Sequence, residues 1–338
     1  MEQEELKLLR LRGQRLLEPA TAHTVVRDLC GLQAQFLSHA IHGLRLRSGS
    51  KELDGLVKSW TLRGTMHMFT QEDLPLFLYE GRKRTLRPQD TMESDNRIGK
   101  ERKRYFADLI ISSVESGIET REALKAACMA AGMTEMEGES LFDPWGGVIR
   151  ALCEAGFLCH KVQEKKAYML CPPFEPMERE QAELELAGRY FASYGPASLK
   201  DAAYFFGTTQ KQVKYCLSRL PAETTTCEGN TLFFVPKEKP VSVGIPKCMF
   251  LAGFDPLMLG YDKRENPFLP QRYIRNVFSS AGIVMPAVLL HGRVVGKWKS
   301  KGKTIEVTLF EAVSQRDLEH IRQYAEIFWP DKHFGCMG

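Results

Sequence analysis

The pattern of apolar and polar positions is most regular between residues 105 and 170. Four apolar residues near its start are three or four positions apart, as on one face of a helix: Phe106, Leu109, Ile110 and Val114. A second helix is predicted between the N-cap residue Thr120 and Gly132, and a third helix at 145–154. Two short apolar runs on either side of a charged turn at 163–166 then predict a hairpin. Three helices followed by a hairpin are typical of a winged helix.

The same order of elements is predicted again between residues 184 and 235. Its elements are, in order, helices at 185–195, 199–206 and 210–220, then strands at 223–227 and 231–235. In a helix-turn-helix, the first residues of the recognition helix face a DNA groove. We therefore expect Lys211 and Lys214, near the start of the third of these helices, to contact DNA.

The two ends of the chain differ in pattern. In the first hundred residues, helices are predicted at 4–16, 24–32 and 53–59. After Pro236 the pattern changes, and three strands separated by glycine turns are predicted between 288 and 310. A last amphipathic helix is predicted at 315–328. The chain is thus predicted to be an α+β protein, mainly α, with a β-rich C-terminal unit.

Composition narrows the class of protein. A chain of 338 residues is long enough for two or three compact units. The 46 basic and 42 acidic residues nearly cancel, so a binding site for a polyanion would need local clustering of charge. The nine cysteines form neither a CxxC pair nor a Cys/His array of zinc spacing, so we expect reduced thiols, no metal and no cofactor. The N-terminus has no apolar signal-peptide core, and no apolar run reaches the ~18 residues of a membrane span, which predicts a soluble, cytoplasmic protein.

The chemistry open to Gln33 and Gln35 depends on the local backbone. If a helix continued through 26–37, Gln33 would lie on an apolar stripe and Gln35 about 200° away, because each residue turns ~100°. In an extended or helix-terminal segment, residues two apart share a face, and both amides could hold one water molecule or sugar. From the residues alone, the preferred interpretation is that Gln33 is a hydrogen-bonded core amide and Gln35 a surface residue.

Four motifs, in order along the chain, resemble those of the AlkZ-type DNA glycosylases, and together they cover nearly the whole sequence. They are Gln33-Ala34-Gln35, the block 59–67 ending in Arg63-Gly64-Thr65-Met66-His67, the block 253–257 around Asp255, and the hairpin block 291–298. Each motif alone is weak evidence, but four in this order around two regular winged-helix patterns are fairly specific. Gln35 places the sequence beside AlkZ rather than the AlkX-like subfamily, which has aspartate there.

This resemblance implies a fold of three tandem winged helices and a C-terminal β-barrel-like unit around a DNA-sized concavity. The expected division is a first winged helix at 1–104 with the glutamine motif, a second at 105–175, a third at 180–236 and the β-rich unit at 237–330. The implied activity is that of a monofunctional glycosylase for alkylated purines, which in some members also unhooks interstrand crosslinks. Gln33 and Gln35 would be its catalytic pair.

An amide pair is chemically sufficient for such a substrate. A guanine alkylated on its imidazole ring is already cationic and leaves as a neutral base, so the ~10²–10⁴-fold contribution of a general acid is unnecessary. The enzyme then only has to position a water molecule, and amide carbonyls can accept its protons. Asp255 could stabilise the sugar cation or orient this water, and the equally weighted alternative is that it caps a turn.

Further basic residues are candidates for DNA contact. Arg63 and His67 lie in the second motif, although a histidine between Met66 and Met68 is more often structural. The most basic region, residues 81–104, includes Arg82 and Arg84, and phosphate contact is modestly favoured there over a solvated linker. In the C-terminal hairpin, Lys297 and Lys299 flank Trp298 and could enter a groove, but lysine-rich turns often serve only solubility.

Two other classes of function remain open at this point. In one, the protein is a non-catalytic winged-helix DNA-binding protein or transcriptional regulator, and the glutamines only pack. In the other, the protein is a small-molecule hydrolase, but no Ser/His/Asp or metal constellation supports that chemistry. The expected partner is double-stranded DNA, especially alkylated DNA, with no membrane partner, and we expect a monomer associated with the nucleoid.

Overall fold

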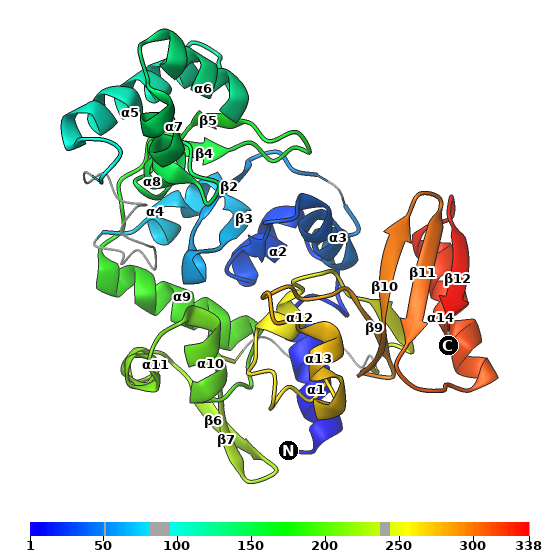
Figure 1. The fold of residues 1–338 in the computed structure, drawn as a ribbon. Helices are drawn as coiled ribbons and strands as arrows, with labels where there is room; N and C mark the ends of the chain where they lie inside the picture. The colour runs from blue at the N-terminus through cyan, green and yellow to red at the C-terminus, as the bar shows by residue number, and fades with distance from the viewer. Residues whose placement is uncertain (51, 81–94, 237–243, 338) are drawn as a thin grey trace. The chain divides into compact units, whose positions relative to one another are not determined.

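The computed structural model describes residues 1–50, 52–80, 95–236 and 244–337, and its fold is shown in Figure 1. By the density of internal contacts the chain divides into two compact units. The first combines Met1–Glu52 with Leu184–Gly338, and the second is Leu53–Glu183. The second unit is therefore inserted into the first along the sequence. Among the described residues, none of the helices combines the length and the apolar character needed to cross a membrane.

The inserted unit is a helical bundle on an antiparallel sheet. Its strands are β2 (Leu56–Trp60), β3 (Met66–Thr70), β4 (Leu158–His160) and β5 (Tyr168–Leu170), paired in the order β3-β2-β4-β5. Its helices are α4 (Leu74–Phe77), α5 (Lys100–Glu115), α6 (Arg121–Ala130), α7 (Glu135–Leu141) and α8 (Gly147–Glu154), with 3₁₀ turns η1 (Leu62–Gly64) and η2 (Gln71–Asp73). The predicted stripe of α5 is in the core, where Phe106 and Ile110 are fully buried. Each such side chain contributes roughly 1.5–3 kcal/mol to stability.

Three sequence predictions for this unit need correction. The helix predicted at 53–59 is wrong, because residues Leu56–Trp60 form strand β2, paired with β3 on one side and β4 on the other. Helix α7 was not predicted, and Thr134 and Glu137 start it with a reciprocal capping box. The helix predicted at 145–154 begins at Gly147. The predicted hairpin at 157–170 is confirmed as β4 and β5.

The N-terminal part of the first unit contains α1 (Gln3–Gly13), α2 (Ala22–Asp28), β1 (Leu32–Gln33) and α3 (Leu37–Ser48). Helix α2 ends four residues before the predicted limit at residue 32. Helix α9 (Arg179–Ser193) then leads back into this unit, where Tyr190 of the helix and Tyr194 directly after it are fully buried.

A helix-turn-helix and a hairpin follow α9, as predicted. They are α10 (Leu199–Phe206), α11 (Gln210–Leu217), β6 (Glu223–Cys227) and β7 (Asn230–Phe234). Ser198 and Asp201 form a capping box at the start of α10. Gly207 ends this helix in the left-handed region, with φ 65°, which makes the tight turn into α11 possible. The number of winged helices in the chain and the four-domain division stay predictions.

The C-terminal part is a half-barrel sheet of five strands covered by a helix (Figure 1, yellow to red). In sheet order its strands are β12 (His333–Met337), β11 (Thr304–Leu309), β10 (Arg293–Lys301), β9 (Ala287–Leu290) and β8 (Cys248–Phe250). The remaining helices are α12 (Pro256–Leu259), η4 (Gln271–Tyr273), α13 (Ile274–Val277) and α14 (Gln315–Phe328). The predicted strands β9 to β11 and helix α14 are confirmed, and β8 and β12 were not predicted. Tyr324 of α14 stacks on Phe250 of β8, with ring centroids 5.5 Å apart.

Candidate active site

The two glutamines lie in an extended segment between helices α2 and α3. Helix α2 ends at Asp28, and the next turn contains two residues in the left-handed region, Cys30 with φ 55° and Gly31 with φ 78°. A helix cannot continue through two such residues. The chain therefore enters the short strand β1, and α3 begins only at Leu37. The extended interpretation of this segment, not the helical one, is confirmed.

The amide groups of Gln33 and Gln35 meet directly. Gln33 Nε2 donates a hydrogen bond of 2.9 Å to Gln35 Oε1. Ala34 between them is 1 % exposed, so the chain alternates as an extended segment does, with the small residue directed inward. Gln33 is half-buried and Gln35 is exposed. Because an amide oxygen has two lone pairs, Gln35 Oε1 keeps one to accept a hydrogen bond from water.

Two aromatic rings accompany this pair. Phe36, which directly follows Gln35, is 49 % exposed, and its ring stacks on Phe254 with centroids 5.7 Å apart. His39 approaches the edge of Phe36 and lies against Gly253, where a β-carbon would come within 2.8 Å of the imidazole ring. Burial lowers the pKa of His39 and so favours the neutral form of its ring. The sequence analysis missed Phe36 and His39, although the position of Phe36 beside Gln35 was an available signal.

Asp255 is held in the interior by protein groups. Its side chain is fully buried, and Arg47 donates to both carboxylate oxygens, from Nη2 to Oδ1 at 2.7 Å and from Nη1 to Oδ2 at 3.1 Å. The backbone N–H of Leu257 also donates to Oδ1, so Asp255 caps helix α12. These contacts are those of the turn-capping alternative. A catalytic role for Asp255 stays a prediction that its contacts do not favour.

Arg47 completes this buried group. The guanidinium also donates to the carbonyls of Gln14 and Gly43, both at 3.0 Å. Gly43 lies on α3 one turn before Arg47, so the pair connects α1, α3 and the start of α12. The arrangement is scaffolding for the segment that begins with the glutamines, because it fixes the helix that follows them.

Arg63 lies in the β2–β3 connection of the inserted unit, and His67 lies on strand β3. Arg63 has φ 55° and Gly64 has φ 64°, so two consecutive residues are left-handed at this tight turn. Arg150 of α8 donates to the carbonyl of Gly64 at 3.0 Å and thereby fixes the turn. His67 is only 2 % exposed, and its Nδ1 is 3.2 Å from the carbonyl oxygen of Thr65. These contacts match the structural interpretation of His67, and DNA contact by either residue stays a prediction.

The predicted basic contacts differ in their surroundings. Lys211 and Lys214 are exposed on α11. Lys297 is half-buried on β10, and the exposed Lys299 pairs with Glu306 of β11 at 2.9 Å. Trp298 is not at the hairpin tip: its side chain is in the core and its indole N–H donates to the carbonyl of Leu251 at 2.8 Å.

The basic region 81–104 is described only from residue 95 onward, so Arg82 and Arg84 lie outside the described residues. Arg102 makes a two-pronged ion pair with Glu137, with both distances 2.8 Å, and this pairing lowers the pKa of that carboxyl to about 2. Lys103 is buried beside Asp95 at 3.4 Å. These two cations therefore already have acidic partners within the inserted unit, and phosphate contact by this region stays a prediction.

Comparison with known proteins defines the class of enzyme. The model of the family described as DNA glycosylase AlkZ-like matches residues 26–328, a span that includes both glutamines, Asp255 and the C-terminal hairpin. The chain therefore belongs to the AlkZ-like DNA glycosylase family, and it is a DNA glycosylase. This assignment favours the enzyme over the regulator and the small-molecule hydrolase considered from sequence.

One curated protein and one solved structure show how far the similarity extends. The curated relative is an interstrand DNA cross-link repair glycosylase of Streptomyces sahachiroi, 24 % identical over 342 residues that cover 92 % of each chain. The solved structure is the DNA glycosylase AlkZ of the same organism, with a TM-score of 0.77 and 21 % identity, covering 100 % of this chain and 99 % of the other. The second comparison establishes the fold.

Proposed function

We propose that the protein hydrolyses the N-glycosidic bond of cationic alkylated purines in DNA, with a water molecule positioned by Gln33 and Gln35. The observation that carries the proposal is the meeting of the two amides at 2.9 Å on an extended segment. The hydrogen bond between them fixes their relative orientation before substrate binds. A water molecule bound there would be held in place without an entropic cost at the moment of reaction.

The reaction needs little proton transfer from the protein. The C1′–N bond breaks as the charged purine leaves neutral, and the water oxygen forms a bond to the electron-poor C1′ atom. An amide is too weak a base to deprotonate that water early. The proton of the attacking water therefore passes to solvent once the new bond has formed. Rate enhancement would come from position, and from a substrate that is activated by its own charge.

We extend this proposal to interstrand crosslinks. The name of the Streptomyces relative refers to them, and the exposure of the site here is compatible with a bulky lesion. Gln35 is exposed, and Phe36 offers half of its surface as a face on which a base can stack. A fully enclosed pocket, by contrast, would reject a base tethered to the opposite strand. Cleavage of one glycosidic bond would release one end of the link.

The direct test is release of base from defined substrates by the full-length protein. Duplexes carrying a single N7-methylguanine, a single crosslink or no lesion would be incubated with enzyme, and abasic sites would be counted after strand cleavage. We expect abasic sites in both damaged duplexes and none above background in the undamaged one. Cleavage of methylated DNA alone would remove the crosslink extension, and cleavage of neither would overturn the proposed substrate class.

A further inference from the structure

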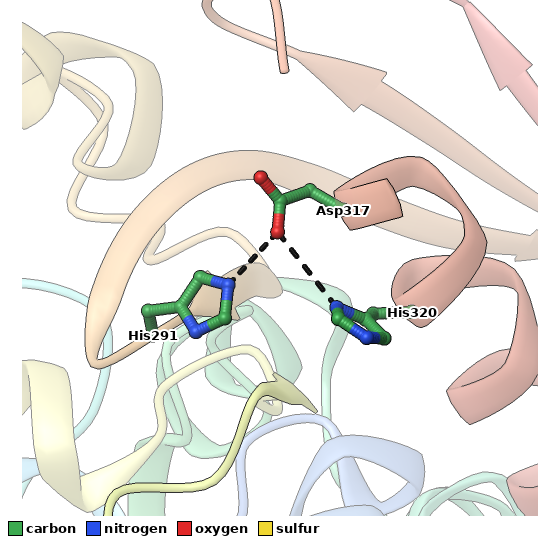
Figure 2. A group of neighbouring side chains, drawn as sticks. All are labelled: His291, Asp317 and His320. Carbon is green, nitrogen blue, oxygen red and sulfur yellow. Dashed lines mark hydrogen bonds and ion pairs between the residues drawn. The ribbon is translucent and has the colours of Figure 1, made fainter. Parts of the chain in front are cut away.

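Three side chains of the C-terminal sheet region converge outside the candidate active site. His291 lies at the turn between β9 and β10, and Asp317 and His320 lie one turn apart on α14. Figure 2 shows both imidazole rings directed at the same carboxylate oxygen. His291 Nε2 is 2.8 Å from Asp317 Oδ1, and His320 Nδ1 is 3.7 Å from it. All three donor atoms lie within 4.8 Å of one another.

Hydrogen bonding alone does not satisfy this group. His320 Nδ1 is shielded from solvent and has no hydrogen-bond partner among the described residues, since the carboxylate oxygen at 3.7 Å is too far. A buried nitrogen without a partner costs free energy, so a ligand that binds this nitrogen would stabilise the folded protein. A cation between the three donors would do so.

The carboxylate is oriented by a second layer of contacts. The Ser314 hydroxyl donates to Asp317 Oδ2 at 2.8 Å and accepts from the Asp317 backbone N–H at 3.1 Å, as the N-cap of α14. This leaves Asp317 Oδ1 directed at the two histidines. Partners of this kind hold the ligands of metal sites in position and tune their affinity.

The backbone of His291 is also unusual. Its φ is 47°, in the left-handed region that a non-glycine residue rarely occupies. The conformation of the turn directs the ring toward α14 rather than into solvent. Contacts that offset the cost of such a conformation are common at ligand sites.

We propose that His291, Asp317 and His320 bind one divalent transition-metal ion, with zinc the best match to two imidazole nitrogens and one carboxylate oxygen. Two ligands about 2.0–2.2 Å from a tetrahedral ion are roughly 3.3 Å apart, and the observed 2.8 Å and 3.7 Å bracket this value. His291 is 54 % exposed, so the ion can enter from solvent and keep a water molecule as its fourth ligand.

The ion would join the β9–β10 turn to the first two turns of α14. That turn precedes β10, the longest strand of the sheet, which carries Lys297 and Lys299. The site is independent of the proposed base-release mechanism, because it contains neither of the glutamines. Its expected effect is on the stability of the C-terminal region, since an ion that binds only the folded state stabilises it.

The test compares zinc binding by the full-length protein and two variants. Metal-free wild type, His291→Asn and the control His333→Asn would each be titrated with zinc against a competing chelator. Asparagine tolerates left-handed backbone, so His291→Asn should keep the turn. His333 is exposed on β12, outside the group. We expect wild type and control to bind one zinc ion. The zinc affinity of the His291 variant should fall by more than the ~10–100-fold that a change in the second layer of contacts causes.

Cobalt distinguishes this site from the nine cysteines of the chain. Cobalt bound to nitrogen and oxygen lacks the intense near-ultraviolet band of a cobalt–thiolate centre. We expect wild type to show only the weak visible bands, and to gain thermal stability with zinc that His291→Asn does not gain. Equal zinc binding by wild type and His291→Asn, or a thiolate spectrum that the substitution leaves unchanged, would overturn the proposal.

Discussion

Gln33–Gln35 and Asp255 belong to the same compact unit and to the same set of family motifs, yet they differ in burial and in their hydrogen-bond partners. The glutamines are held by each other, and Gln35 faces solvent. Asp255 is fully buried, and its two oxygens are occupied by Arg47 and a helix N-terminus. A motif match alone therefore does not separate chemistry from scaffolding. Burial and the remaining hydrogen-bonding capacity of each group do.

The largest expected effect comes from breaking the buried pair. In Asp255→Asn the Arg47 guanidinium loses its counterion in the interior, which typically costs about 3–5 kcal/mol. We expect the free energy of unfolding, measured by urea denaturation, to fall by this amount, while base release per folded molecule changes little. The exposed Asp331→Asn should change stability by less than about 0.5 kcal/mol. A normally stable Asp255→Asn protein that has lost base release would instead make Asp255 catalytic.

A second test of scaffolding uses pH. Burial among Trp298, Phe328 and Trp329 lowers the pKa of His42 to about 4, although its Nε2 is 2.7 Å from the carbonyl of Phe250. The unfolded chain takes up this proton near pH 6.5 and the folded one near pH 4. The stability contribution is therefore present above pH 6.5 and is lost as pH falls to 4.

The measurement is urea unfolding of wild type and His42→Phe between pH 7 and 4. We expect the variant to lose less stability over this range than wild type, at roughly 1.4 kcal/mol per unit of pKa difference removed. His160 of the inserted unit, whose pKa burial lowers to about 3, titrates in the same direction and remains in both proteins. If the free energy of unfolding depended on pH in the same way in both proteins, His42 would not be protonated on unfolding in this range.

Gln35→Ala is expected to change stability less than Asp255→Asn does, but to reduce base release more. The side chain is exposed, so unfolding should change by less than about 0.5 kcal/mol. Base release should fall at least ~10-fold with DNA affinity nearly intact, because a contact to the attacking water acts in the transition state. Gln323→Ala, an exposed glutamine on α14, is the matched control. Equal losses in affinity and turnover would make Gln35 a residue that holds DNA.

The double variant sharpens this assignment. If Gln33 and Gln35 hold one water molecule, Gln33→Ala with Gln35→Ala should lose no more activity than the worse single variant. Single-turnover rates for the four proteins give this comparison. Losses that multiply would show that the two amides act on different atoms.

The smallest effect is expected at Lys211 and Lys214. Each lysine that neutralises a phosphate contributes roughly 0.9 to the slope of log affinity against log salt. We expect Lys211→Gln with Lys214→Gln to flatten this slope on two unrelated undamaged duplexes equally. An unchanged slope would mean that α11 does not contact DNA, and a change on one duplex only would indicate base readout.

Local patterns were sufficient for much of the fold but not for every element. Helix α14 and strands β9 to β11 were predicted because their apolar periods are long and their turns contain glycine. The segment 53–59 was misread because Leu53, Leu56 and Val57 also fit helical spacing, whereas pairing with β3 and β4 decides its structure. The pairing with β4 joins Lys58 to His160, about 100 positions away, and is not visible locally.

The candidate site was only half predictable for the same reason. Resemblance identified Gln33 and Gln35, but their geometry depends on the left-handed Cys30 and Gly31, and a non-glycine residue in that region is not readable from spacing. The Arg47–Asp255 pair joins residues 208 positions apart. Nothing in the sequence indicated that Arg47 would neutralise this particular carboxylate.

The order of the two units along the chain has a consequence for synthesis on the ribosome. The inserted unit is complete in sequence at Glu183, but the segment with the glutamines belongs to a unit that ends at Gly338. Cys30 contacts Leu186, and Leu29 accepts from Tyr194, so these two partners of the segment emerge after the insertion. At about 5–20 residues per second, its last partners follow roughly 8–30 s later. The inserted unit thus has time to fold before the segment with the glutamines has all of its partners.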